Sequence, residues 1–68
     1  MESVYKVIEL IGTSPKSWEE AARNAVETAT RTLSDLRIAE AVAFDMKVEE
    51  GKVVAYRVKV KVSFKFRD

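Results

Sequence analysis

The stretch VAYRVKVKVSFKFR, residues 54–67, alternates between apolar and mainly basic side chains almost without exception. One set of alternate positions is entirely apolar: Val54, Tyr56, Val58, Val60, Val62, Phe64 and Phe66. The other set carries most of the charge: Ala55, Arg57, Lys59, Lys61, Ser63, Lys65 and Arg67. Because successive side chains of a β-strand point to opposite faces, this pattern predicts a strand with one buried face and one charged face.

The residues before this stretch predict that it is the second arm of a long hairpin between Leu36 and Phe66. Residues 36–48 have apolar side chains at their even positions, interrupted by Glu40. The sequence Glu49-Glu50-Gly51 then separates the two arms. It suits a three-residue loop in which Gly51 adopts the left-handed conformation.

Two further elements are predicted in the N-terminal half of the chain. Residues Ser3–Gly12 are rich in β-branched and aromatic types and lead into turn formers, so they predict a strand, apolar on both faces. Residues 17–33 predict a helix with an apolar stripe, and Ser17 with Glu20 fits a capping box at its start. The predicted fold class is α+β in the order β-α-β-β, with a three-stranded antiparallel sheet packed on one amphipathic helix. Residues 1–68 form a single domain.

Size and composition predict that this domain works as part of a homo-oligomer. A core in a chain of 68 residues rarely stabilises a fold without disulfides, metals or oligomerisation. Cysteine and histidine are absent, and most of the helix stripe is alanine. One helix covers one face of the sheet, which leaves apolar side chains on the other, and such a patch usually marks a partner surface. The simplest partner is another copy of the chain.

Charge and hydropathy argue against several classes of function. The formal net charge is +1, and the basic face of the last strand lacks interleaved aromatic residues for base stacking, so we expect no nucleic-acid partner. We interpret this face as ion-paired with carboxylates of neighbouring strands or subunits, from the set Glu9, Glu40, Asp45, Glu49 and Glu50. No apolar run approaches the ~20 residues of a membrane span, and no signal-peptide pattern is present. We therefore expect no membrane partner and a cytoplasmic location.

Three features of the sequence could have a catalytic or ligand-binding role, but a structural role explains each of them better. Glu40 lies among apolar neighbours, where a cross-subunit ion pair with Arg37 or a lysine of the last strand explains it better than a role as a general acid. Trp18 could stack on a ligand, but its place on the apolar stripe favours a core or interface role. Residues 13–17 lack the glycines of a phosphate-binding loop. With no Ser/His/Asp arrangement and no carboxylate dyad, we predict no catalytic residue and no enzymatic activity.

Nearly the whole chain resembles the dodecin family. The resemblance rests on VYKVIELIGTSPKSWEEAARNAV (residues 4–26), a TL-x-DL helix exit (residues 32–36) and AEAVAFDMKVEEGKVVAYRVKVKVSFK (residues 39–65). It implies a β-α-β-β subunit, twelve copies of which assemble into a hollow sphere. It also implies a small-molecule binding and storage protein, because many dodecins bind riboflavin or its derivatives in pairs near twofold axes.

The resemblance places the two flavin contacts of the family at Ile38 and Arg57. Flavin-binding dodecins use a tryptophan early in the second strand to stack on the isoalloxazine ring, and a glutamine in the third strand to bond its edge. Ile38 has no π face, and Arg57 offers only hydrogen-bond donors. Stacking is worth roughly 1–3 kcal/mol, so its loss lowers affinity by roughly 5- to 150-fold. We expect binding of riboflavin or FMN to be weak or lost.

Two alternatives and one conflict stay open at this stage. Arg57 favours another anionic ligand, whereas carboxylates between subunits could hold a divalent cation such as calcium, with no individual metal ligand assigned. Simple alternation along the hairpin puts Ile38 and Arg57 on opposite faces, although the resemblance puts them at one site. A β-bulge in the second strand or a different loop length would bring them to the same face.

Overall fold

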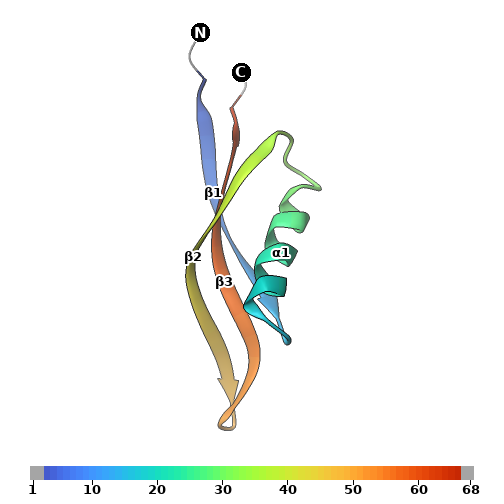
Figure 1. The fold of residues 1–68 in the computed structure, drawn as a ribbon, viewed down its shortest axis with the longest axis vertical. Coiled ribbons are helices and arrows are strands. Elements are labelled where there is room, and N and C mark those ends of the chain that lie inside the picture. Colours follow the sequence, from blue (N-terminus) through green and yellow to red (C-terminus); the bar gives the residue numbers. More distant parts are fainter. Residues whose placement is uncertain (1–2, 67–68) are drawn as a thin grey trace.

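The computed structural model describes residues 3–66, and it has the element order expected from the sequence. The elements are β1 (Tyr5–Ser14), α1 (Trp18–Ala29), β2 (Leu36–Glu49) and β3 (Lys52–Lys65). The strands form one antiparallel sheet in the order β1-β3-β2. Figure 1 shows α1 on one side of the sheet and the β2–β3 hairpin extending well past the start of the helix. The predicted α+β class with β-α-β-β order is therefore confirmed.

Helix α1 begins at the predicted cap but ends earlier than the sequence pattern indicated. The Ser17 hydroxyl oxygen accepts a hydrogen bond from the Glu20 backbone N–H at 3.0 Å. The helix ends at Ala29, and the Thr30 hydroxyl donates to the Glu27 carbonyl at 2.7 Å. Threonine is a poor helix former because its hydroxyl competes for backbone carbonyls, which accounts for the early end. Among residues 3–66, no helix is long and apolar enough to cross a membrane.

The core lies between α1 and the facing side of β3, and it is shallow. Its buried residues are Ala21, Ala25, Val58, Val60 and Val62. The larger side chains of Ile8, Leu10, Val26, Leu33 and Leu36 pack around it and are only partly buried. Within the described part of the chain, valine is the largest side chain that is fully buried. This core agrees with the expectation that one protomer has little apolar area to bury.

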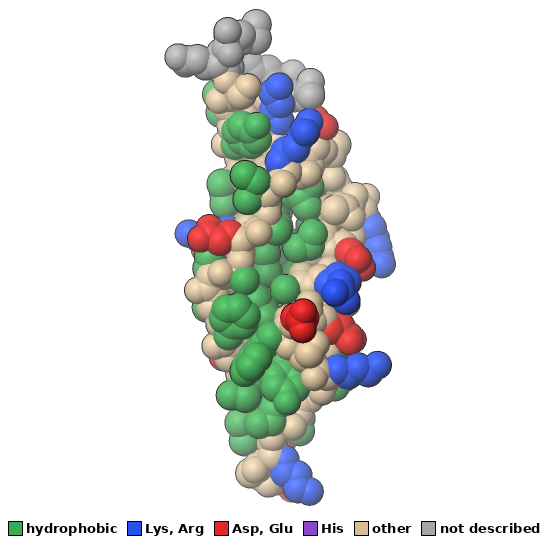
Figure 2. Space-filling model, viewed as in Figure 1, with side chains coloured by type: hydrophobic (Ala, Val, Ile, Leu, Met, Phe, Trp, Pro, Cys, Tyr) green, Lys and Arg blue, Asp and Glu red, His purple; other side chains and the backbone are tan. Residues whose placement is uncertain are grey.

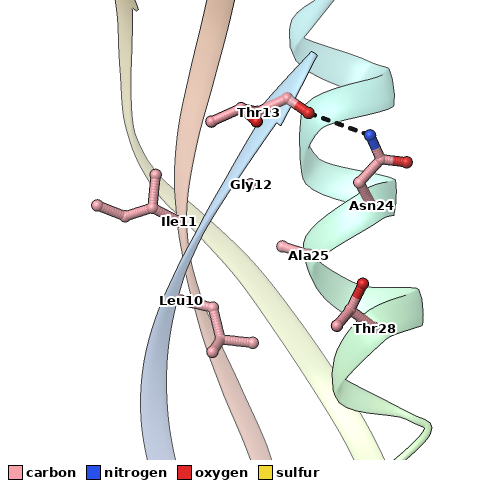
Figure 3. A pocket seen from close by; sticks show the side chains of 7 residues that line it. All are labelled: Leu10, Ile11, Gly12, Thr13, Asn24, Ala25 and Thr28. Atoms are coloured by element: carbon pink, nitrogen blue, oxygen red, sulfur yellow. Dashed lines mark hydrogen bonds between the residues drawn. The ribbon is translucent and has the colours of Figure 1, made fainter.

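Strand β1 and helix α1 approach each other closely at Gly12. A Cβ atom on Gly12 would overlap the backbone carbonyl of Ala21, so no larger residue fits there without a shift of the helix. The Asn24 amide donates to the Thr13 carbonyl at 3.1 Å next to this contact. Figure 3 shows Ala25 and Asn24 of the helix directed toward β1, whereas Ile11 points to the opposite side of the strand.

The faces of β2 differ from the sequence-based expectation. Phe44 shares a face with Val58, as the alternation predicted, but the register shifts between Ala41 and Ala43, which identifies Val42 as a bulge residue. Immediately before the bulge, the odd positions Ala39 and Ala41 therefore face the helix side. A further register shift between Leu36 and Ile38 returns Leu36 to the helix side, where it packs against the core. The prediction that the even positions of residues 36–48 share one face was wrong, and Ile38 lies on the face away from α1.

The hairpin loop also differs from the prediction. Glu49 pairs with Lys52, so Glu50 and Gly51 form a two-residue loop instead of a three-residue one. Both residues are left-handed, with φ of 52° at Glu50 and 76° at Gly51. Two left-handed residues in succession are typical of the type I′ turn, whose twist matches that of the strands. The left-handed conformation expected for Gly51 is confirmed.

The protomer is elongated and exposes a large apolar area. Its extents are 54 × 19 × 16 Å and its radius of gyration is 14.1 Å, against about 11 Å for a compact domain of this length. Its accessible surface is 5285 Å², whereas a monomer of this mass exposes about 4,300 Å². Figure 2 shows a band of hydrophobic side chains along the strands down to the hairpin. Exposed members of the sheet include Tyr5, Val7, Ile11, Ile38, Phe44, Met46 and Val48.

Candidate ligand site on the outer sheet face

The face of the sheet directed away from α1, called the outer face below, carries both positions that the dodecin resemblance singled out. We assign side chains to this face from the strand register and from the burial of the alternate positions, which point toward α1. It consists of Tyr5, Val7, Glu9, Ile11 and Thr13 on β1, Arg57, Lys59, Lys61, Ser63 and Lys65 on β3, and Ile38, Glu40, Ala43, Asp45 and Lys47 on β2. The outer face is therefore a mixed surface of charged and exposed apolar side chains.

Arg57 forms a two-point ion pair with Asp45 across the β2–β3 ladder. Its Nε donates to Oδ1 of Asp45 at 2.7 Å, and its Nη2 donates to Oδ2 at 2.9 Å. Asp45 and Arg57 are also direct partners in the strand register. Such a planar fork between guanidinium and carboxylate fixes the orientation of both groups.

The ion pair shifts the titration of both groups in the direction that favours their charged forms. The hydrogen bonds from Arg57 lower the pKa of Asp45 below its ordinary value of 3.8. Desolvation of the carboxylate opposes this shift, whereas the positive charges of Arg57 and Lys59 lower the pKa further. The hydrogen bonds to Asp45, together with its negative charge, raise the pKa of Arg57. The pair is therefore fully ionised at neutral pH.

Trp18 supports this ion pair from the other side of the sheet. Its indole Nε1–H donates to the backbone carbonyl of Asp45 at 3.1 Å. Its ring also packs edge-on against Phe44, with centroids 6.0 Å apart, and against Tyr56 at 5.2 Å. Phe44 and Tyr56 directly precede the two members of the ion pair, so the first turn of α1 holds both strands at this level. The Trp18 side chain is partly exposed, at the rim of the packed core.

Ile38 shares the outer face with Arg57 but lies far from it within one protomer. Ile38 is opposite Ser63 and is 63% exposed. Ser63 and Arg57 are six positions apart on β3, which corresponds to about 20 Å at roughly 3.3 Å per residue. The bulge at Val42 thus resolves the conflict over faces that the sequence left open. One planar ring system in contact with Ile38 does not reach Arg57 of the same copy.

The remaining basic residues of the outer face confirm part of the predicted charge pairing. The Lys61 ammonium lies 3.9 Å from a carboxylate oxygen of Glu9 on β1. Glu40 is exposed on the outer face, and its partner in the register is Lys61, one of the β3 lysines. Between residues 3 and 66, no three carboxylates lie close enough together to hold a metal ion.

The sequence pattern did not identify the specific contacts of two residues of this site. Asp45 was one of several carboxylates available to the basic strand, and only the register identifies Arg57 as its partner. Trp18 was assigned to the core or an interface, whereas its indole also bonds to the backbone of Asp45. Its position, three residues before the first buried helix residue Ala21, gave no signal of that bond.

The sequence of the chain matches the family model described as Dodecin over residues 4–67. The chain belongs to the dodecin family. This membership confirms the family resemblance seen in the sequence and agrees with the β-α-β-β fold. The two candidate positions, Ile38 and Arg57, were assigned from the resemblance to this family.

Individual dodecins match the chain over almost its whole length. The protein named calcium dodecin from Mycobacterium tuberculosis is 51% identical over 65 residues, which covers 96% of this chain and 92% of that protein. The crystal structure of calcium dodecin from the same organism, described as calcium chelating with a novel calcium-binding site, has a TM-score of 0.86 at 53% identity and covers 96% and 93% of the two chains. A dodecin structure from Streptomyces coelicolor has a TM-score of 0.91 at 35% identity, with 97% and 94% covered.

Proposed function

We propose that this dodecin is a self-assembling binding protein that holds a small ligand or ion between copies of the chain, as a store or buffer without catalysis. The observation that carries the proposal is the separation of Ile38 from Arg57. Both lie on the outer face, but six residues of β3 keep them apart in one protomer. A ligand site that uses both positions is complete only where two copies meet.

The exposed surface of the protomer supports the self-association in this proposal. The accessible area exceeds that of a typical monomer of this mass by roughly 1,000 Å², which is comparable to the ~800 Å² that one partner contributes to a standard interface. Much of the exposed area belongs to large apolar residues such as Val7, Ile11 and Phe44. Burying these side chains against other copies would stabilise a protomer whose own core is shallow.

The chemistry of the two candidate positions favours weak binding of flavin. Ile38 provides an apolar contact without a π face, so it does not reproduce ring stacking. Arg57 is engaged by Asp45 through two hydrogen bonds, so two of its N–H groups are already occupied. A flavin edge that needs an acceptor finds none on a guanidinium.

Calcium is the second candidate ligand, supported by the relative from Mycobacterium tuberculosis that is named calcium dodecin. Calcium takes six to eight oxygen ligands, which carboxylates from one protomer do not supply in residues 3–66. The outer face carries Glu9, Glu40 and Asp45 as exposed carboxylates. A calcium site would therefore draw its oxygens from more than one copy.

Titration of riboflavin fluorescence tests the flavin part of the proposal. We expect little quenching by the wild-type protein at micromolar riboflavin, and a gain of roughly 5- to 150-fold in affinity for Ile38→Trp combined with Arg57→Gln, because the variant regains a stacking ring and an acceptor. Ile38→Leu is the matched control and should leave the affinity unchanged. Tight binding of riboflavin by the wild type would contradict the expectation of a weakened site.

Calorimetry with calcium and magnesium tests the second candidate on the same assembled protein. Saturable heat with calcium and much weaker heat with magnesium would support a site with many flexible oxygen ligands. Flat traces with both ions would exclude a calcium store.

A further inference from the structure

Asp45 occupies the part of Arg57 that an anionic ligand would use. The Nε and Nη2 atoms of Arg57 form the fork that matches a carboxylate or phosphate, and both donate to Asp45 at 2.7 and 2.9 Å. A ligand phosphate approaching Arg57 must compete with a carboxylate already in place. The identity of the residue opposite Arg57 on β2 therefore controls what the arginine can bind.

We propose that Asp45 is a specificity-determining residue, which excludes ligands carrying a phosphate or carboxylate group from Arg57. The proposal rests on the proposed function, because it concerns the ligand class accepted at the same outer-face site. It goes beyond that function in naming a residue outside the two candidate contacts. It also predicts that a single neutral substitution converts Arg57 into a residue that binds anions.

The charges around Arg57 support this effect. Lys59 follows two positions later on the same face of β3, and its charge acts on Asp45 as that of Arg57 does. Thr13 of β1 lies opposite Arg57 in the register and has a hydroxyl that can donate. With a neutral residue at position 45, two cations and a hydroxyl face one region with no carboxylate between them. Such a region attracts a phosphate group.

Trp18 is a positioning residue for this selectivity. Its N–H holds the carbonyl of Asp45 at 3.1 Å, and its ring packs against the residues that precede both members of the ion pair. These contacts limit the movement of β2 relative to β3 at the level of Arg57. The backbone of Asp45 is therefore held beside Arg57, which keeps its carboxylate within reach of the guanidinium.

The affinities of FMN and riboflavin compared in an Ile38→Trp background test the proposal, because the two flavins differ by one phosphate. Both are titrated by fluorescence quenching at low salt into I38W, I38W/D45N and I38W/D45N/R57Q. We expect D45N to raise the ratio of FMN affinity to riboflavin affinity by roughly two- to fivefold, the range of an exposed ion pair. Adding R57Q should abolish the gain, and inorganic phosphate should compete with FMN only in I38W/D45N.

Glu40→Gln in the same background is the matched control. It removes one negative charge from the outer face of β2 opposite Lys61, which is four positions from Arg57 on β3. An equal gain for E40Q and D45N would overturn the proposal, because it would reveal a general charge effect. An unchanged ratio in D45N would also overturn it.

Direct titration with inorganic phosphate keeps the proposal testable if none of the variants binds flavin. Phosphate binding by D45N that is absent in the wild type and in D45N/R57Q would support it, and no binding by D45N would overturn it. Light scattering on each variant separates this result from the proposed function. A wild-type protein that fails to assemble contradicts the proposed function, whereas an assembled D45N variant that ignores phosphate contradicts only the role of Asp45.

Discussion

Arg57 and Asp45 face each other across β2 and β3, and both side chains are substantially exposed, at 42% and 56%. Exposed ion pairs contribute little to stability because water screens them and because long side chains lose freedom when they pair. The more important consequence of this pair is orientation. Two parallel hydrogen bonds fix the plane of the guanidinium, and the backbone of Asp45 is fixed in turn by Trp18.

The pH dependence of unfolding should reveal the Asp45–Arg57 pair. Because the pKa of Asp45 is lower in the folded protein than its ordinary value of 3.8, the pair stabilises the fold above that value. This contribution is lost as the pH falls through the lowered folded pKa. We expect the urea midpoint of the wild type to exceed that of D45N at pH 7 and the difference to shrink below about pH 4.

An Arg57→Gln background provides the control for this measurement. Without the guanidinium, the effect of Asp45→Asn on the urea midpoint should depend much less on pH, because only the charge of Lys59 then lowers the pKa of Asp45. A difference between wild type and D45N that persists unchanged into the acid range would contradict the assignment of the lowered pKa to this pair.

At the scale of elements, the contact between β1 and α1 depends on two small residues. Gly12 allows the strand to pass next to the carbonyl of Ala21, and Ala25 lies on the other side of the same position. The small alanine side chains of the helix and the glycine of the strand together allow this close approach. Close packing of this kind compensates in part for the absence of large buried side chains.

Gly12→Ala should destabilise the protein, because the new methyl group meets backbone atoms of the helix and not a flexible side chain. We expect a loss of about 1–3 kcal/mol in the free energy of unfolding, measured by denaturation in urea. Gly51→Asn is the matched control, since that site has open space and asparagine tolerates the left-handed conformation. A loss for Gly51→Asn as large as that for Gly12→Ala would contradict the steric explanation.

At the scale of the whole molecule, one helix is too small a cover for the sheet. The hairpin runs beyond the start of α1, and both β1 and β2 are edge strands of the three-stranded sheet (Figure 1). The exposed apolar residues occur on both faces, with Val7 and Ile11 on the outer face and Phe44 and Met46 on the helix side. Both faces therefore offer surface for contacts with other copies.

Size-exclusion chromatography with light scattering should give a mass many times the 7.7 kDa of one chain, as expected for a shell of dodecin type. The combined substitutions Val7→Lys and Ile11→Lys should shift the protein toward smaller species, because they place charges on an apolar part of the outer face. Threonine at the same two positions keeps a β-branched, uncharged side chain and serves as the control. A wild-type monomer or dimer would contradict the proposed assembly.

The sequence alone determined the features that depend on local pattern. Strict alternation over residues 54–66 predicted the buried face of β3, and Val58, Val60 and Val62 are buried. The Ser17 cap predicted the start of α1, and the family resemblance located Ile38 and Arg57, whose roles as ligand contacts stay predictions. These features could be predicted because each follows from side-chain period, from cap chemistry or from a long ordered match.

Only the tertiary structure decided the register of β2 and the partnership that depends on it. Residues Ala39, Ala41 and Ala43 are small and do not define a buried face, so alternation alone could not locate the bulge at Val42. The shift between Ala41 and Ala43 puts Ile38 on the outer face together with Asp45 and Arg57. A second register shift, between Lys47 and Val48 next to the two-residue turn, then aligns Asp45 with Arg57. This contact joins residues twelve positions apart, and no local pattern specifies it.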